Sequence, residues 1–244
     1  MSDFLRKNKT YIIVIGLLVI YLIVFRLVSL AINKENSKYA NIVVDGINIW
    51  EYNESNWRVV SEDEFKEKEQ IFDLYSSSEY YGDYTVKVNN KKLYAFDDKY
   101  KSLQYDDTVL AINSNYDIDV YFFEYSEVLE QDNNILAGFI NSDYVSKIKK
   151  ITLDVNANEV EECFYVVDYY DSTDVLFTEI YYYDGKLKEI IKNNGSMYSV
   201  YDIDYILDIN DDDKYELIVS SSYFNVVSYK IYKLDGKNYK LFLE

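Results

Sequence analysis

The chain has no histidine and no proline, and it has a single cysteine, Cys163. Histidine is the commonest general base and the commonest transition-metal ligand, so its absence excludes Ser-His-Asp catalysis, Cys-His catalysis and His-ligated zinc. One cysteine cannot form an intramolecular disulfide, so the fold must rest on core burial or on a metal ion. Cys163 lies in a strand-like pattern and is interpreted as a buried small apolar residue, with a reactive thiol as the alternative.

Positive charge is also scarce. The 244 residues include 25 Lys or Arg and 43 Asp or Glu, a net charge of −18. Residues 1–40 carry +4, which leaves −22 for residues 41–244. This excess of negative charge argues against nucleic-acid binding and favours hard cations, basic partners or simple solubility. The 29 tyrosines suit β-strands, and a tyrosine-rich glycan-binding surface is the weaker alternative.

The longest apolar run covers residues 11–30, YIIVIGLLVIYLIVFRLVSL, and its only formal charge is Arg26. A helix of this length matches a hydrocarbon core of about 30 Å, so the run predicts a single transmembrane helix. The predicted organisation is a cytoplasmic tail at 1–10, a linker at 31–41 and an extracellular β-rich domain at 42–244.

The flanking charges give the orientation of this span. Arg6, Lys7 and Lys9 precede it, which favours a cytoplasmic N-terminus and an extracellular acidic body at the cell membrane. A secretory signal cleaved after Ala31 is the alternative, because Ser29-Leu30-Ala31 is a small-x-small triplet. An uncleaved signal-anchor is favoured, because twenty residues exceed a usual signal core.

Strand signals with turn residues between them recur after the linker, and they predict a mainly β, antiparallel domain. Three hairpins are expected, over residues 41–50 about Asp45-Gly46, over 84–96 about Asn89-Asn90, and over 108–125 about Asn113 to Asn115.

One or two short helices are expected within this domain. Ser61 and Glu64 form a capping box, and Phe65, Ile71, Phe72 and Tyr75 follow at helical spacing. A second short helix is predicted within residues 127–140.

The most specific motif is the loop Asp208–Glu216, DINDDDKYE. Oxygen-bearing side chains stand at its positions 1, 3, 5 and 9, and position 7 offers a backbone carbonyl. These candidate ligands are Asp208, Asn210, Asp212, Lys214 and Glu216. Six to eight oxygens suit Ca²⁺, so a calcium site is expected, with a solvated acidic turn as the alternative. Position 6 is Asp213 where glycine usually makes the sharp turn, and Asp tolerates a left-handed backbone.

A weaker copy of this loop begins 54 residues earlier, at Asp154. Its candidate ligands are Asp154, Asn156, Asn158 and Glu162. Each copy is followed by a hairpin turned on Asp-Gly-Lys, at 184–186 and at 235–237. The chain therefore contains two degenerate repeats, at about 147–195 and 201–244.

These loops and hairpins resemble the FG-GAP or VCBS type of repeat, which occurs in the calcium-bearing blades of integrin-like β-propellers and in many bacterial surface proteins. The resemblance covers about residues 147–244. It implies a propeller-blade-like sheet array and Ca²⁺ at the second loop, more weakly at the first. The FG and GAP signatures are missing, and so is the glycine of each loop.

The expected function is a membrane-anchored extracellular binding or assembly module stabilised by calcium, and not an enzyme. Its partner would be a surface polymer or a protein, and the aromatic residues around Trp50 and Trp57 are candidate contacts. Two alternatives remain open: a cell-surface hydrolase that uses paired carboxylates, and an accessory subunit of a membrane complex.

Overall fold

The computed structural model describes residue 21 and residues 38–53, 56–65, 71–97, 109–140, 144–171, 174–192 and 198–244. The chain divides into two compact units, Met1–Lys38 and Tyr39–Glu244. The predicted tail, most of the linker and the predicted span at 11–30 lie outside the described residues, apart from Tyr21, which is helical. Among the residues described, no helix is both long enough and apolar enough to cross a bilayer.

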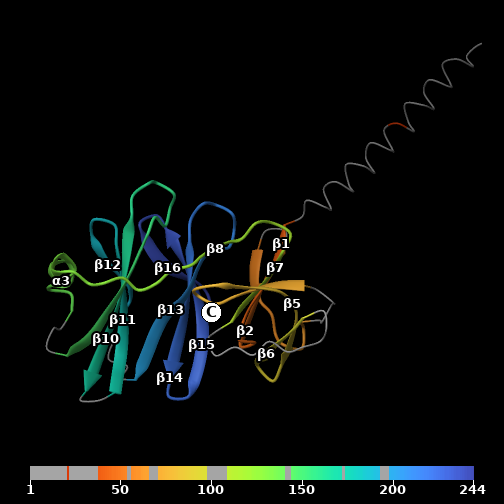
Figure 1. Ribbon diagram of the computed structural model, residues 1–244, viewed down its shortest axis with the longest axis horizontal. Coiled ribbons are helices and arrows are strands. Elements are labelled where there is room, and N and C mark those ends of the chain that lie inside the picture. The colour runs from red at the N-terminus through yellow and green to blue at the C-terminus, as the bar shows by residue number, and fades with distance from the viewer. Residues whose placement is uncertain are drawn as a thin grey trace, which may run out of the picture. The chain divides into compact units, whose positions relative to one another are not determined.

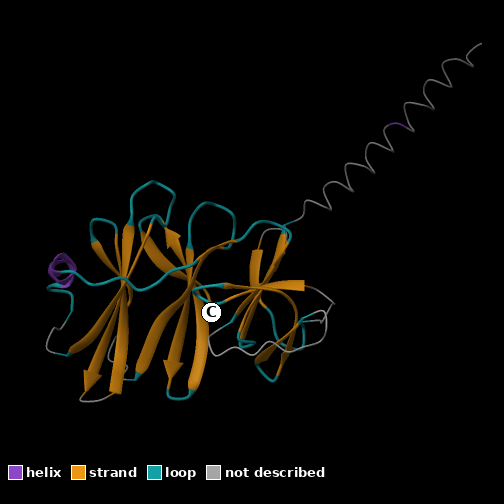
Figure 2. Cartoon of the chain, in the orientation of Figure 1, coloured by secondary structure: helices purple, strands orange, loops and turns teal. Residues whose placement is uncertain are grey.

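The second unit is mainly β, as predicted, and its strands form three antiparallel sheets (Figures 1 and 2). The first sheet has seven strands in the order β3-β2-β1-β7-β4-β5-β6. These strands are β1 (Tyr39–Val44), β2 (Asn48–Asn53), β3 (Asn56–Val59), β4 (Ile71–Tyr75), β5 (Tyr80–Asn89), β6 (Lys92–Phe96) and β7 (Leu110–Ser114).

The other two sheets fall mainly in the segments predicted as repeats, and each contains a four-stranded antiparallel meander in chain order. The first consists of β9 (Val145–Leu153), β10 (Glu162–Asp171), β11 (Asp174–Tyr183) and β12 (Leu187–Ile191). The second consists of β13 (Ser199–Asp208), β14 (Glu216–Tyr223), β15 (Val226–Asp235) and β16 (Asn238–Leu243). A fifth strand, β8 (Asp119–Tyr121), is added beside β13. Each candidate loop therefore joins the first two strands of one meander.

The five-stranded sheet is buried on both faces. On β14, Leu217 and Val219 pack with the four-stranded sheet, while Ile218 between them packs with the seven-stranded sheet. This alternation follows from the strand period of two. Because both faces are covered, its strands read as nearly continuous apolar runs, such as Ile206-Leu207 and Leu217–Val219.

The outer face of the four-stranded sheet is covered by α3 (Glu130–Leu136), which falls within the helix predicted at 127–140. Leu136 is fully buried there. Asp132 accepts a hydrogen bond from the Tyr165 hydroxyl at 2.6 Å and pairs with the Lys150 ammonium at 2.9 Å. A buried pair of this kind must stay intact, because one partner alone would be an uncompensated charge.

The helix predicted from Ser61 through Tyr75 is wrong. In the described residues 61–65 there is one turn, in which the amides of Glu64 and Phe65 donate to the Ser61 carbonyl, whereas Ile71–Tyr75 is strand β4 and not helix. In β4 the buried side chains alternate, and Phe72 is one of them. The spacing mistaken for helical periodicity is therefore strand periodicity.

The hairpins predicted at 41–50 and 84–96 are confirmed as β1–β2 and β5–β6. The hairpin predicted over 108–125 is wrong, because β7 pairs with β1 and β4, whereas β8 pairs with β13.

Candidate metal-binding loops

The loop 208–216 is built around the carboxylate of Asp208, at the end of β13. This carboxylate accepts hydrogen bonds from three backbone amides of the loop, those of Asn210 (3.2 Å), Asp212 (3.2 Å) and Asp213 (2.8 Å). Such charge-assisted bonds are stronger than bonds between neutral groups. One aspartate therefore folds the loop back onto the end of the strand from which it leaves.

Glu216, the first residue of β14, closes the loop from the other side. Its Oε2 accepts the amide of Ile209 at 3.0 Å, and its Oε1 accepts the Asn210 side-chain amide at 3.5 Å. Asp211 and Asp213 both have φ of +59°. The sharp turn thus forms without glycine, as predicted for Asp213, because Asp is one of the few residues that enter this region readily.

The loop 154–162 repeats this skeleton bond for bond. The Asp154 carboxylate accepts the amides of Asn156 (3.3 Å), Asn158 (3.1 Å) and Glu159 (2.7 Å). Glu162 accepts the Val155 amide at 3.0 Å and the Asn156 side-chain amide at 3.0 Å. Positive φ recurs at Ala157 and Glu159, the positions of Asp211 and Asp213.

The second loop differs from the first in its electrostatics. Glu216 is 2% exposed, and burial is the main cause that raises its pKa to about 8, with Asp212 and Asp208 adding to the rise. The Oδ1 atom of Asn210 is buried and has no hydrogen-bond partner in the described structure. A buried acceptor without a donor is costly, and a cation or an ordered water would satisfy it.

The predicted ligands are brought together in each loop, but they mostly face the loop's own backbone. Asp212 accepts the Lys214 amide at 3.1 Å and lies 3.3 Å from the Lys214 ammonium, which supplies a local counter-charge. Within the described ranges, no three acidic or cysteine side chains are placed to share a metal ion. The donor set of the second loop nevertheless fits a hard cation, because it consists of oxygens and includes the unsatisfied Asn210 Oδ1.

The two loops touch each other at the same end of the sheets. The Tyr215 amide donates to the Val155 carbonyl at 3.0 Å, and the Tyr239 hydroxyl donates to the Tyr215 carbonyl at 2.8 Å. The Tyr116 hydroxyl, from the segment before β8, donates to the Ile209 carbonyl at 2.6 Å. The loops are therefore held by the strands and segments around them and not only by their own bonds.

A cavity of about 310 Å³ lies beside the second loop. Its lining joins loop residues to two aspartates of the segment that leads into β8; these residues are Asp117, Ile118, Asp119, Ala157, Asp208, Asp211, Asp213 and Tyr215. Asp119 lies opposite Asp208 in the β8–β13 register, and its carboxylate accepts the Tyr215 hydroxyl at 2.6 Å. Sequence reasoning missed Asp117 and Asp119, because no local motif marks a strand that pairs with a partner so far along the chain.

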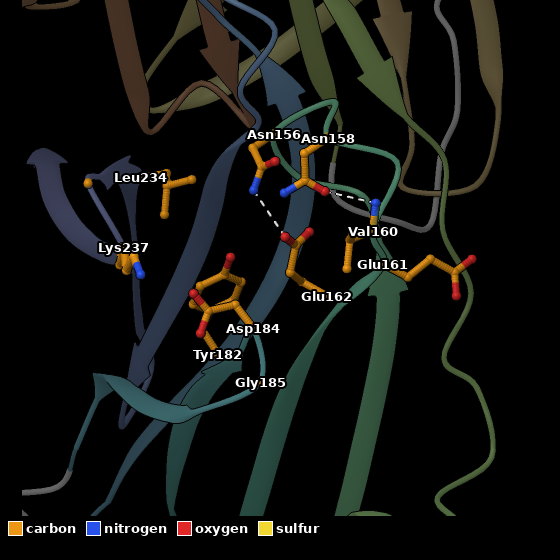
Figure 3. Close-up of a pocket in the computed structure, with 11 residues that line it drawn as sticks. Asn156, Asn158, Val160, Glu161, Glu162, Tyr182, Asp184, Gly185, Leu234 and Lys237 are labelled. Carbon is orange, nitrogen blue, oxygen red and sulfur yellow. Dashed lines mark hydrogen bonds between the residues drawn. The ribbon is translucent and has the colours of Figure 1, made fainter.

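A second cavity, of about 480 Å³, lies beside the first loop (Figure 3). Figure 3 shows the Asn156 side chain directed at Glu162. The rest of the wall comes from Tyr182 of β11, Leu234 of β15 and the two Asp-Gly hairpins. The carboxylate oxygens of Asp154 and Glu162 thus already accept hydrogen bonds from donors of their own loop.

One carboxyl pair that bears on the hydrolase alternative is Asp73 and Asp83, on β4 and β5. Both accept a hydrogen bond from the Tyr80 hydroxyl, at 2.9 and 2.6 Å. Burial raises the pKa of Asp73, and the Tyr80 hydrogen bond lowers the pKa of Asp83. Of the two tryptophans expected to offer contacts, Trp50 is fully buried in the core and is not available to a partner.

A comparison with protein-family models found no match. Neither the curated proteins nor the solved structures contained one that matches the chain.

Proposed function

We propose that the chain is a single-pass membrane protein whose extracellular β-rich body is a binding or assembly module, stabilised by Ca²⁺ at the loop 208–216. The observation that carries this proposal is the pairing of two four-stranded meanders with equivalent Asp-to-Glu loops at one end. Stacked copies of one structural unit are typical of proteins that offer an extended surface for binding, and here the unit is a meander with its Asp-to-Glu loop. The same feature supports the view that these sheets are propeller-blade-like repeats of the FG-GAP or VCBS type.

The membrane part of the proposal rests on the sequence. Twenty residues at 11–30 with one charge suit a spanning helix, and the basic residues before them suit a cytoplasmic N-terminus. The acidic body, residues 42–244, then faces the exterior. Alkaline carbonate extraction tests the span, because an integral protein stays with the membrane pellet. External protease on intact cells tests the side, because it should remove the body and leave an N-terminal epitope tag protected.

Calcium would act on the second loop as a structural ion. The loop residues Asp208, Asn210, Asp212 and Glu216 supply oxygens, and Lys214 supplies a backbone carbonyl. Bound Ca²⁺ would provide the positive charge that Asp208 and Glu216, both buried, lack among their loop partners. The support for this step is the buried, unpartnered Asn210 Oδ1.

The partner of such a module is best sought in its native setting. Proximity labelling from a C-terminal fusion, on intact cells, should enrich surface proteins or wall-associated proteins. A fusion with residues 11–30 deleted is the matched control. Recovery of mainly cytosolic proteins with the full chain, together with its release by carbonate, would contradict the proposed location.

A further inference from the structure

The end of the five-stranded sheet opposite the loops carries an exposed aromatic tip, formed by Tyr198, Tyr223, Phe224 and Val226. Their exposed fractions are 50%, 49%, 71% and 67%. Strand β14 runs from Glu216 at the loop to Tyr223 at the tip, and its arrowhead marks this end in Figure 1. At about 3.3 Å per residue the tip is roughly 23 Å from the loop. Exposed apolar side chains gathered in this way mark interaction sites.

The backbone is strained where it presents two of these rings. Tyr198 has φ of +74° and Phe224 has φ of +53°, a region that bulky residues rarely occupy. The two rings stack with centroids 5.8 Å apart and planes inclined by 29°, and Tyr223 meets Phe224 edge to face at 4.7 Å. The Tyr198 amide donates to the Leu176 carbonyl of β11, which fixes the base of its ring. Strain of this kind is typical of functional positions.

The hairpin end that carries Tyr223, Phe224 and Val226 has no charged residue in its sequence, although the chain is strongly acidic. Residues 217–229, LIVSSSYFNVVSY, contain no Asp, Glu, Lys or Arg, although 28% of the chain is charged. Ser199, Ser222 and Asn225 adjoin the ring-bearing residues in the sequence and carry hydroxyl and amide groups. Ser199 lies opposite Tyr223 in the β13–β14 register. The end of the β14–β15 hairpin, residues 217–229, therefore has hydroxyl and amide groups and no charged side chain of its own to pair with an ionic partner.

We propose that the aromatic tip binds an uncharged polysaccharide. The C–H face of a pyranose ring carries partial positive charge and packs on the negative face of an aromatic ring. Neighbouring hydroxyl and amide groups then exchange hydrogen bonds with sugar hydroxyls, as polar groups do at other ligand sites. This inference rests on the proposed extracellular location and gives the binding module its partner class.

Affinity electrophoresis tests the inference with the full-length chain in a mild detergent. Native gels are cast with hydroxyethylcellulose, mixed-linkage β-glucan or galactomannan, and with anionic polygalacturonate for contrast. We expect retardation by at least one neutral polymer and none by polygalacturonate. Absence of retardation in every neutral polymer, or retardation by polygalacturonate alone, would overturn the proposal.

The sharpest variant is Phe224→Asn, because Asn accepts a positive φ and keeps the turn while removing the ring. We expect binding at least tenfold weaker than in the parent chain, together with an unchanged or higher melting temperature. Tyr94→Ala, at an exposed tyrosine of β6, is the control and should bind as the parent does. Equal binding by the Phe224→Asn and parent chains would place the contact elsewhere and sink the proposal.

A second copy of the chain is the competing occupant. Sedimentation velocity of the parent and Phe224→Asn chains separates the two cases. A dimer that Phe224→Asn dissolves, without any polysaccharide binding, would overturn the glycan assignment. Membrane extraction and calcium binding do not involve the tip, so these measurements distinguish failure of this inference from failure of the proposed function.

Discussion

The loops 154–162 and 208–216 share one hydrogen-bonded skeleton but differ in what it encloses. In both, the first aspartate accepts three backbone amides and the last glutamate accepts two further donors. In the first loop the asparagine side-chain amide is 3.0 Å from the glutamate, whereas in the second it is 3.5 Å away. Only Asn210, of the two asparagines, has a buried oxygen without a partner in the described structure.

Different positions of the loops determine the backbone fold and the charge. Positions 1 and 9, which are Asp and Glu in both loops, set the fold, because their carboxylates organise the backbone. The middle positions set the charge: the first loop has Ala157 and Asn158, and the second has Asp211 and Asp212. In the first loop the Asn156 side-chain amide bonds to Glu162 at 3.0 Å. In the second loop the Asn210 Oδ1 atom is buried without a hydrogen-bond partner in the described structure and can still accept a bond.

The largest expected effect is the loss of the first aspartate of a loop. Asp208→Ala orphans three amides at a buried site and should lower the free energy of unfolding by about 4 kcal/mol. Asp154→Ala, at a half-buried position, should lower it by about 2 kcal/mol. Urea unfolding of the full chain, followed by fluorescence, gives both values. Equal losses of unfolding free energy would contradict the expectation that the deeper burial of Asp208 makes its removal more costly than that of Asp154.

The next effect is a pH dependence of stability to which Glu216 of the second loop contributes. Glu216 has a folded-state pKa of about 8 against an ordinary 4.5, so the folded state holds a proton that the unfolded state releases. Its stabilisation is complete below about pH 4.5 and is lost as the pH rises to about 8, on the order of 3 kcal/mol. Stability is measured across this window in EDTA.

Glu216→Gln and Glu162→Gln are the matched pair for this prediction. Glu216→Gln should reduce the decline between pH 5 and 8 by more than Glu162→Gln does. Part of the decline persists in both, because burial raises the pKa of Asp204 on β13 to about 7. A profile that neither substitution changes would assign the titration to groups outside the loops.

The smallest effect concerns the support of each loop by its neighbours. Tyr116→Phe removes the hydroxyl that donates to the Ile209 carbonyl and should lower the free energy of unfolding by about 1 kcal/mol. The equivalent carbonyl of Val155 is bonded by a backbone amide, which a side-chain substitution does not remove. Hydrogen exchange should accordingly rise in the second loop and not in the first. Tyr94→Phe, an exposed position, is the control and should change neither loop.

Local chemistry explains why so much of the loops was predictable. Asp and Asn at alternate positions favour turns that bond their own backbone, so the pattern at 154–162 and 208–216 located both loops and the meanders that they begin. The pairing partner of β8 was not predictable, because Asp119 meets Asp208 through a long-range register that leaves no local pattern.

The prediction of helix at 71–75 rests on Phe72 and Tyr75, which are spaced three apart, as on a helix face. Phe72 and Leu74 are the side chains that the core buries. A short apolar segment fits either period, and the neighbouring strands β5 and β7 decide between them.

Calcium binding by the full chain tests most directly whether the second loop has the capacity that the first lacks. Isothermal titration, with Asn210→Ala and Asn156→Ala as matched variants, measures stoichiometry and location together. One Ca²⁺ per chain, lost in Asn210→Ala and retained in Asn156→Ala, is the expected result. No binding, or binding that depends on Asn156 instead of Asn210, would contradict it.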